Sequence, residues 1–273
     1  MANGAGKRLT TTRKRSLESY KQVYFRRLND VHIAAQVTCA ALDAHRRSLV
    51  SLSKKAGANR FHHYEVPSAG RPTARIRRER RDVEALVKRA MEAGEYQKSL
   101  VLAVSITEDY IINILKLLLR AHPERLVRGV KGGDARSTIQ VEDFVSRGRD
   151  EIIEELIRAR ISGVLYGKPA EYLKYLAMIM EIEVPQDTLE AFFEIKATRD
   201  IIVHADGRVN DRYVEKAGGR ARAEVGKLLV ADRVYFDGAI AAMKNLIRQI
   251  HDGVCAKYAE DEEVRRQAAH FQE

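Results

Sequence analysis

Apolar residues recur at intervals of three and four along most of this chain, a spacing that places them on one face of an α-helix. The last such stretch shows the pattern clearly, because Phe236, Ile240, Met243 and Ile247 alternate steps of four and three. Helices that each carry one apolar face bury it by packing together. We therefore predict an all-α fold, a bundle of four to five core helices. The long predicted helices cover residues 16–52, 96–121, 150–165, 185–204 and 232–258, and a short one covers 170–180.

Shifts in composition divide the chain into parts with different expected structure. Glycines and prolines gather in residues 54–72, which predicts an irregular linker, and the pair Gly218-Gly219 predicts a loop-like segment over residues 209–229. The four expected parts are a disordered basic tail over residues 1–14, a helical basic extension over 15–95, the helical bundle over 96–258 and a polar C-terminal tail over 259–273.

The first long helix, predicted over residues 16–52, contains no proline and is amphipathic along its whole length. A stripe of apolar residues on so long a helix needs a partner. That partner is either the bundle or the same helix of a second chain, and the sequence leaves both alternatives open.

Positive charge is concentrated in the N-terminal part of the chain. Residues 1–100 hold 22 Lys and Arg against 9 Asp and Glu. Such a surplus favours a polyanion such as RNA as partner, and a solvated helical face is the alternative. Few aromatic residues lie nearby for base stacking, so sequence-specific reading is not indicated. The candidate nucleic-acid contacts, expected on a short basic helix, are Arg75, Arg77, Arg78, Arg80 and Arg81.

Several classes of protein are disfavoured by the composition. No apolar run reaches the eighteen or so residues that span a bilayer, and we expect a cytoplasmic protein without membrane contact. Cys39 and Cys255 lie far apart at helical apolar positions, which is typical of reduced core thiols. The adjacent pair His62-His63 lacks nearby cysteine or carboxylate ligands at a suitable spacing. We therefore expect neither a metal site nor a cofactor.

The candidate site for chemistry is the segment Arg199-Asp200-Ile201-Ile202-Val203-His204. Asp206-Gly207 is a turn signal, so His204 is expected in the last turn of its helix, with Gly207 in the left-handed conformation just beyond it. A five-residue step in a regular helix turns the side chain by roughly 140°, so Arg199 and His204 cannot point the same way unless the helix loosens there. Two copies related by a two-fold axis would instead bring each arginine near the partner's histidine.

Three carboxylates are candidates to support this pair. Glu108 interrupts the apolar seam of the helix over residues 96–121, so it is either paired with Arg199, which would orient the guanidinium, or placed at the rim of the bundle. Asp200 follows the arginine directly, and Glu194 precedes it by about one turn. Either of them could help to orient the arginine or the histidine.

Residues 198–210 and Tyr213 resemble the signature of HEPN-domain proteins, an arginine followed after four to six residues by a histidine. The similarity extends more weakly over residues 96–258. The chain departs from the family pattern at Asp200, where a small polar residue such as asparagine is usual, and at Asp206, where some HEPN toxins carry a tyrosine.

The resemblance implies a helical bundle, often dimeric, and in many members a metal-independent endoribonuclease of bacterial defence, toxin–antitoxin or RNA-processing systems. It implies Arg199 and His204 as catalytic residues, RNA ends carrying 2′,3′-cyclic phosphate, and a possible antitoxin or regulatory partner. Arg208, just beyond the motif, is a further candidate RNA contact. Because other members have no known activity, the alternative is a non-catalytic module for dimerisation and for binding nucleic acid or a partner protein.

Overall fold

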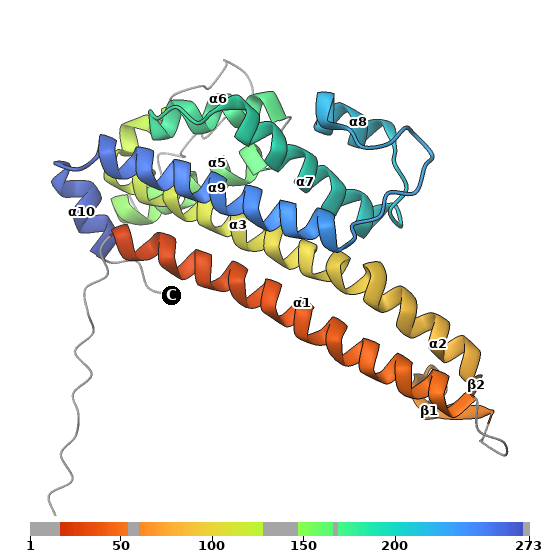
Figure 1. The fold of residues 1–273 in the computed structure, drawn as a ribbon. Coiled ribbons are helices and arrows are strands. Elements are labelled where there is room, and N and C mark those ends of the chain that lie inside the picture. Colours follow the sequence, from red (N-terminus) through yellow and green to blue (C-terminus); the bar gives the residue numbers. More distant parts are fainter. Residues whose placement is uncertain (1–16, 54–59, 128–146, 166–168, 270–273) are drawn as a thin grey trace, which may run out of the picture.

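The computed structural model describes residues 17–53, 60–127, 147–165 and 169–269, and this part of the chain is mostly helical, as predicted (Figure 1). The α-helices are α1 (Leu17–Ser53), α2 (Arg80–Arg89), α3 (Glu95–Ala121), α5 (Arg149–Leu165), α6 (Pro169–Met180), α7 (Gln186–His204), α8 (Asp211–Ala217), α9 (Arg233–Lys257) and α10 (Glu262–Ala269). The strands are β1 (Phe61–Ser68) and β2 (Arg71–Glu79), and the tail predicted over residues 1–14 lies outside the described residues.

The core lies around α3, which packs against α1, α7 and α9 (Figure 1). Val104, Ile111, Leu115 and Leu118 of α3 have no exposed surface, as their spacing predicted. Each side chain of this size contributes roughly 1.5–3 kcal/mol when it is fully buried. The sequence periodicity therefore located the central element of the bundle.

The stripe of α1 is buried by the bundle of its own chain. Tyr24 and Leu28 are almost fully buried, and the Tyr24 hydroxyl donates to Asp109 Oδ2 at 2.9 Å on α3. At its other flank, α1 contacts α9 through the pair His32 Nε2–Asp237 Oδ1 at 2.7 Å. The sequence left two partners open for the apolar stripe of α1. In the structure this stripe packs against the bundle of the same chain.

The prediction of an irregular linker is wrong over residues 61–72, and the basic helix predicted from Arg75 begins only at Arg80. Residues 54–59 of the predicted linker lie outside the described residues. Residues 61–79 form an antiparallel β-hairpin in which Phe61 pairs with Glu79 and Val66 with Ala74, and only at Arg80 does α2 begin. The β-branched and aromatic residues of β1 favour a strand, and Ala69-Gly70 supplies the turn. Arginine is a good helix former, so the run at 75–81 favoured a helix, whereas pairing with β1 makes most of it a strand.

A single π-helical turn, η1 (Ala90–Gly94), joins α2 to α3, and the Glu95 amide donates to the Ala90 carbonyl five residues earlier. The buried stripe across this junction is Val83, Val87, Met91, Tyr96 and Leu100, with one five-residue step among steps of four. In a regular helix that step would turn Tyr96 away from the core by roughly 140°. The wider turn absorbs the extra residue and keeps the stripe on one face.

Two segments predicted without secondary structure contain short helices. Within residues 209–229, α8 is capped by Asn210, whose side-chain oxygen accepts from the Tyr213 amide at 2.9 Å, and Tyr213 is buried. In the predicted C-terminal tail, α10 buries Val264 and Ala268 against the main core. Both helices are too short for a periodic pattern to identify them.

Two further predictions from the sequence concern the cysteine thiols and the lack of a membrane-spanning segment. Cys39 is buried and Cys255 half-buried, and both are free thiols. Among the helices of the described ranges, none is both long and apolar enough to cross a lipid bilayer.

His251 on α9 is a buried histidine whose burial lowers its pKa from 6.5 to about 4. The unfolded chain takes up this proton below pH 6.5, whereas the folded chain takes it up only near pH 4. Stability is therefore expected to fall as the pH drops through this window, by roughly 3 kcal/mol in total, and to be unaffected above it. Urea unfolding at a series of pH values should show a smaller loss for His251→Gln. The exposed-residue control His45→Gln should keep the wild-type slope, and equal slopes for all three proteins would contradict the assignment.

Candidate functional site

Arg199 lies on α7, on the side that faces α3, and its guanidinium is held between two carboxylates. Its Nη2 donates to Glu108 Oε2 at 2.9 Å, so the pair anticipated from the interrupted seam is present. Its Nε lies 3.3 Å from Asp200 Oδ1, an ion pair without hydrogen-bond geometry. The Arg199 side chain is 20% exposed, so it sits at the edge of the core.

Two lysines complete an alternating chain of charges around Arg199. Lys196 Nζ lies 2.5 Å from Glu108 Oε1, and Lys216 Nζ of α8 lies 2.8 Å from Asp200 Oδ2. Each carboxylate is therefore shared by two cations, and the group as a whole carries one positive charge in excess. We call Lys196, Glu108, Arg199, Asp200 and Lys216 the ion-pair chain. Sequence inspection missed both lysines, because their roles depend on contacts between separate helices.

His204 is the last residue of α7, as predicted, and its side chain is exposed. The Ala205 amide closes the final helical turn on the Ile201 carbonyl at 2.9 Å, and Gly207 follows with a φ of 73°. A Cβ at Gly207 would lie 3.2 Å from the Leu229 carbonyl, so glycine also suits the close approach of the chain. In the described part of the molecule the His204 imidazole has no hydrogen bond or ion pair.

Helix α7 stays regular through His204, so the side chains of Arg199 and His204 point in different directions, as predicted for a regular helix. Arg199 points toward α3, whereas His204 lies at the surface. A rotation of roughly 140° separates them, and one chain alone does not bring both groups into one pocket. Exposed apolar side chains lie beside His204: Val203 precedes it, and Leu228 approaches Gly207 with its Cδ1.

Glu194 lies in a second, separate network rather than beside the motif pair. Its Oε1 accepts from Thr198 at 2.7 Å, Tyr213 at 3.0 Å and Arg222 at 2.9 Å, and its Oε2 accepts from Tyr235 at 2.8 Å. Burial raises the pKa of both tyrosines, which keeps their hydroxyls protonated as donors. This buried carboxylate fastens α7 to the segment after the motif and to α9, and so it positions the last turns of α7.

The predicted RNA contacts divide into two places. Arg208 is exposed four residues after His204 and flanks the motif. The other five arginines lie on β2 and α2, at the far end of the molecule (Figure 1). The helical run from Arg80 to Glu108 spans 28 residues, or about 40 Å at the usual rise.

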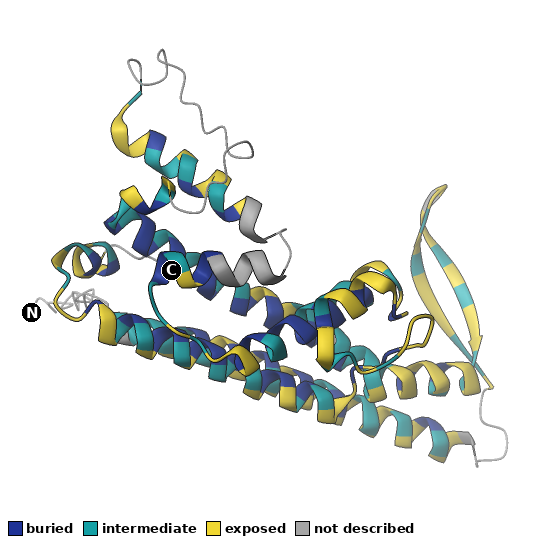
Figure 2. Cartoon of the chain, turned by 90° about the horizontal axis from the view of Figure 1, so that it is seen from above, coloured by how far each residue is buried: buried dark blue, intermediate teal, exposed yellow. Residues whose placement is uncertain are grey.

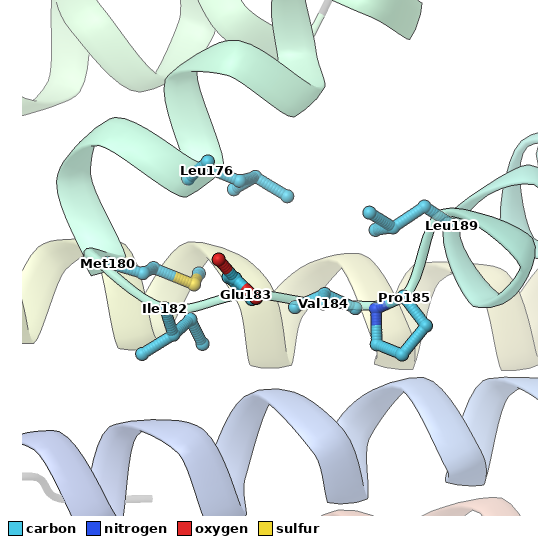
Figure 3. A pocket seen from close by; sticks show the side chains of 8 residues that line it. Leu176, Met180, Ile182, Glu183, Val184, Pro185 and Leu189 are labelled. Carbon is cyan, nitrogen blue, oxygen red and sulfur yellow. The ribbon is translucent and has the colours of Figure 1, made fainter.

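A hollow of about 530 Å³ between α6 and the start of α7 lies apart from the motif (Figure 3). Glu183 is the one ionisable residue in its lining. The lining residues are Leu176, Ala177, Met180, Ile182, Glu183, Val184, Pro185 and Leu189. An apolar wall of this kind offers little to a phosphate, so the hollow is not the candidate site. Across the described residues, no group of three or more His, Cys, Asp or Glu side chains is arranged to hold a metal ion.

Comparisons with protein-family models, with curated proteins and with solved structures find no match for this chain.

Proposed function

We propose that this protein is a metal-independent endoribonuclease of the HEPN type, which cleaves single-stranded or exposed RNA. The observation that supports the proposal best is the contrast between its two motif residues. Arg199 is anchored by Glu108 at the edge of the core, while the His204 imidazole is exposed and has no partner among the described residues. A fixed cation and an unengaged proton carrier are the two groups that this chemistry requires.

In the proposed reaction His204 exchanges protons with the 2′-hydroxyl nucleophile or with the 5′-oxygen leaving group. The 2′-oxygen attacks phosphorus and the bond to the 5′-oxygen breaks, which leaves a 2′,3′-cyclic phosphate and a 5′-hydroxyl. Arg199 stabilises the charge that develops on the phosphoryl oxygens. Glu108 holds Nη2, and Nη1 has no partner within the described structure, so the guanidinium keeps donors for a phosphate.

The active form is proposed to be a homodimer, because the divergence of Arg199 and His204 within one helix leaves each chain with half of the constellation. The exposed Val203 and Leu228 beside His204 supply apolar surface for such a contact. From the resemblance to HEPN proteins we propose that this activity serves bacterial defence, a toxin–antitoxin system or RNA processing, with an antitoxin or other regulator as partner.

Mixing two inactive variants tests the composite site. Arg199→Ala and His204→Ala are each expected to be inactive alone. When they are co-refolded, half of the dimers contain one of each chain, and each such dimer has one intact pair made of Arg199 from one copy and His204 from the other. Cleavage should return to about a quarter of the wild-type value. If the mixture stays inactive although mixed dimers are recovered through a different affinity tag on each variant, the composite arrangement is wrong.

A second candidate function is a non-catalytic module that binds nucleic acid or a partner protein. The observation in its favour is that Arg199 is already paired with both Glu108 and Asp200, as a purely structural arginine would be. Retention of RNA by the wild-type protein, with no cleavage under any condition and no dependence on His204, would favour this module over the nuclease.

A further inference from the structure

The β1–β2 hairpin stands clear of the helices at one end of the molecule (Figure 2). Within the described chain it belongs to a sheet of only these two strands, and most of its residues are exposed. An isolated hairpin is marginally stable in water, and its open edges invite unwanted pairing. The bundle does not need this element for its core, so its shape points to a role outside the fold.

Positive charge lies on both faces of the hairpin. Cross-strand partners share a face, so Arg75 and Arg77 lie on one side with Glu65 and His63, while Arg78 lies on the other side with His62. A flat anionic surface such as a membrane would attract one face only. Cations on both faces suit a ligand that surrounds the hairpin, such as a groove with phosphates along both walls.

Three of these arginines are available to a ligand. Glu79 neutralises Arg60, at 3.1 Å, and Arg81, at 2.9 Å. Arg75, Arg77 and Arg78 are exposed, and none of them forms an ion pair with another described residue. The Arg77 guanidinium stacks over the Phe61 ring at 4.1 Å, an arrangement that fixes its plane and leaves its N–H edge to face a phosphate.

The same stacking argues for a double-stranded ligand. Proteins that bind single strands offer aromatic rings on which bases stack. Here the Phe61 ring is covered by Arg77 and is also approached by Arg60 at 5.9 Å. Tyr64 is 42% exposed, but its ring stacks with that of His62, so the hairpin offers no row of open rings for successive bases. A two-stranded ribbon fits the major groove of B-form DNA. An A-form RNA duplex has a deep and narrow major groove, so there the arginines of the hairpin would contact the phosphates rather than read the bases.

We propose that the hairpin is an arm that binds a double-stranded segment of the RNA substrate, about 40 Å from the motif along α2 and α3. This inference rests on the proposed ribonuclease function for the identity of the ligand. The substrate is then an RNA with a double-stranded stem beside the cleaved single-stranded linkage. The arm selects structured RNA, and the motif cuts it.

Binding experiments on full-length protein in the His204→Ala background test the arm without cleavage. The probes are a 20-base-pair RNA duplex, a single strand of one of its sequences and a DNA duplex of the same sequence. The test variant is Arg75→Ala/Arg77→Ala/Arg78→Ala. Its charge-matched control is Arg248→Ala/Arg265→Ala/Arg266→Ala, three exposed arginines of α9 and α10. A second variant, with lysine at positions 75, 77 and 78, keeps the charge and tests whether the hairpin has merely misfolded.

The His204→Ala protein with an unchanged hairpin should bind the RNA duplex more tightly than the single strand. The alanine variant should lose this preference, with a decrease of about 3 in the slope of log affinity against log salt, while the control and the lysine variant keep most of it. The inference is overturned if the alanine variant binds the RNA duplex as tightly as the unmodified protein, or if it loses affinity equally for single and double strands. It is also overturned if the unmodified protein binds the DNA duplex more tightly than the RNA duplex, or prefers anionic vesicles to RNA. Since none of these readouts requires cleavage, failure of the nuclease proposal would appear separately.

Discussion

RNA cleavage measured in EDTA is expected to fall by about 10²- to 10⁴-fold when His204 is replaced by alanine, because the reaction loses its proton carrier. Arg199→Ala is expected to cost about 10²- to 10³-fold, since the developing charge on the phosphoryl oxygens loses its stabilising donor. The measurement is the initial rate on a labelled RNA, with the ends of the products identified as 2′,3′-cyclic phosphate and 5′-hydroxyl.

These losses should arise without unfolding, for reasons visible in the structure. The His204 side chain is exposed, so its removal should change the free energy of unfolding by no more than about 0.5 kcal/mol. Removal of Arg199 leaves Glu108 paired with Lys196 and Asp200 paired with Lys216, so no partly buried carboxylate is stranded. The controls are His45→Ala and Arg248→Ala, which remove an exposed histidine and an exposed arginine elsewhere. Equal weak cleavage by wild type and both motif variants would indicate a contaminating nuclease and refute the assignment.

Glu194→Ala is expected to lower the free energy of unfolding by about 3–5 kcal/mol, the largest single-residue effect on stability that we predict. Four donors converge on this carboxylate, which is only 7% exposed. Its loss would strand the hydroxyls of Tyr213 and Tyr235 and would leave Arg222 without its counter-charge, each at a desolvation cost. Urea unfolding followed by circular dichroism measures the change.

The matched control is Glu190→Ala, one turn earlier on the same helix, whose side chain is 46% exposed. It should change stability by less than about 0.5 kcal/mol. Glu194→Gln should fall between the two, because its amide keeps one acceptor but loses the charge. A Glu194→Ala variant as stable as the control would show that the network around Glu194 does not support α7.

Sequence reasoning succeeded where burial imposes a regular spacing. The predicted helix over residues 96–121 matches α3 to within one residue, because its buried side chains repeat with the helical period. The end of α7 at His204 was predictable because Gly207 supplies the left-handed backbone that terminates a helix. Glu108 stood out as the one charge on an apolar seam, and the structure pairs it with Arg199.

Other features of the fold and the site could not be predicted from a regular spacing of residues in the sequence. The hairpin alternates exposed arginines with half-buried residues, and its arginines masked the two-residue period of β2. Lys196 and Lys216 looked like ordinary surface charges, since their link through Glu108 and Asp200 depends on how α3, α7 and α8 pack. Glu194 was assigned to the motif from its nearness in sequence, although its helical position directs it to a different network.

The π-helical turn at Ala90–Gly94 has a consequence for how this architecture tolerates changes in length. If one residue of that turn were deleted, the buried stripe would run at even steps of four through an ordinary helix, and both flanks would keep their present neighbours. Deletion of one residue can therefore be absorbed at this joint without a change in the direction of the hairpin. Related chains that are shorter here by a single residue should still carry their basic ribbon in the same direction.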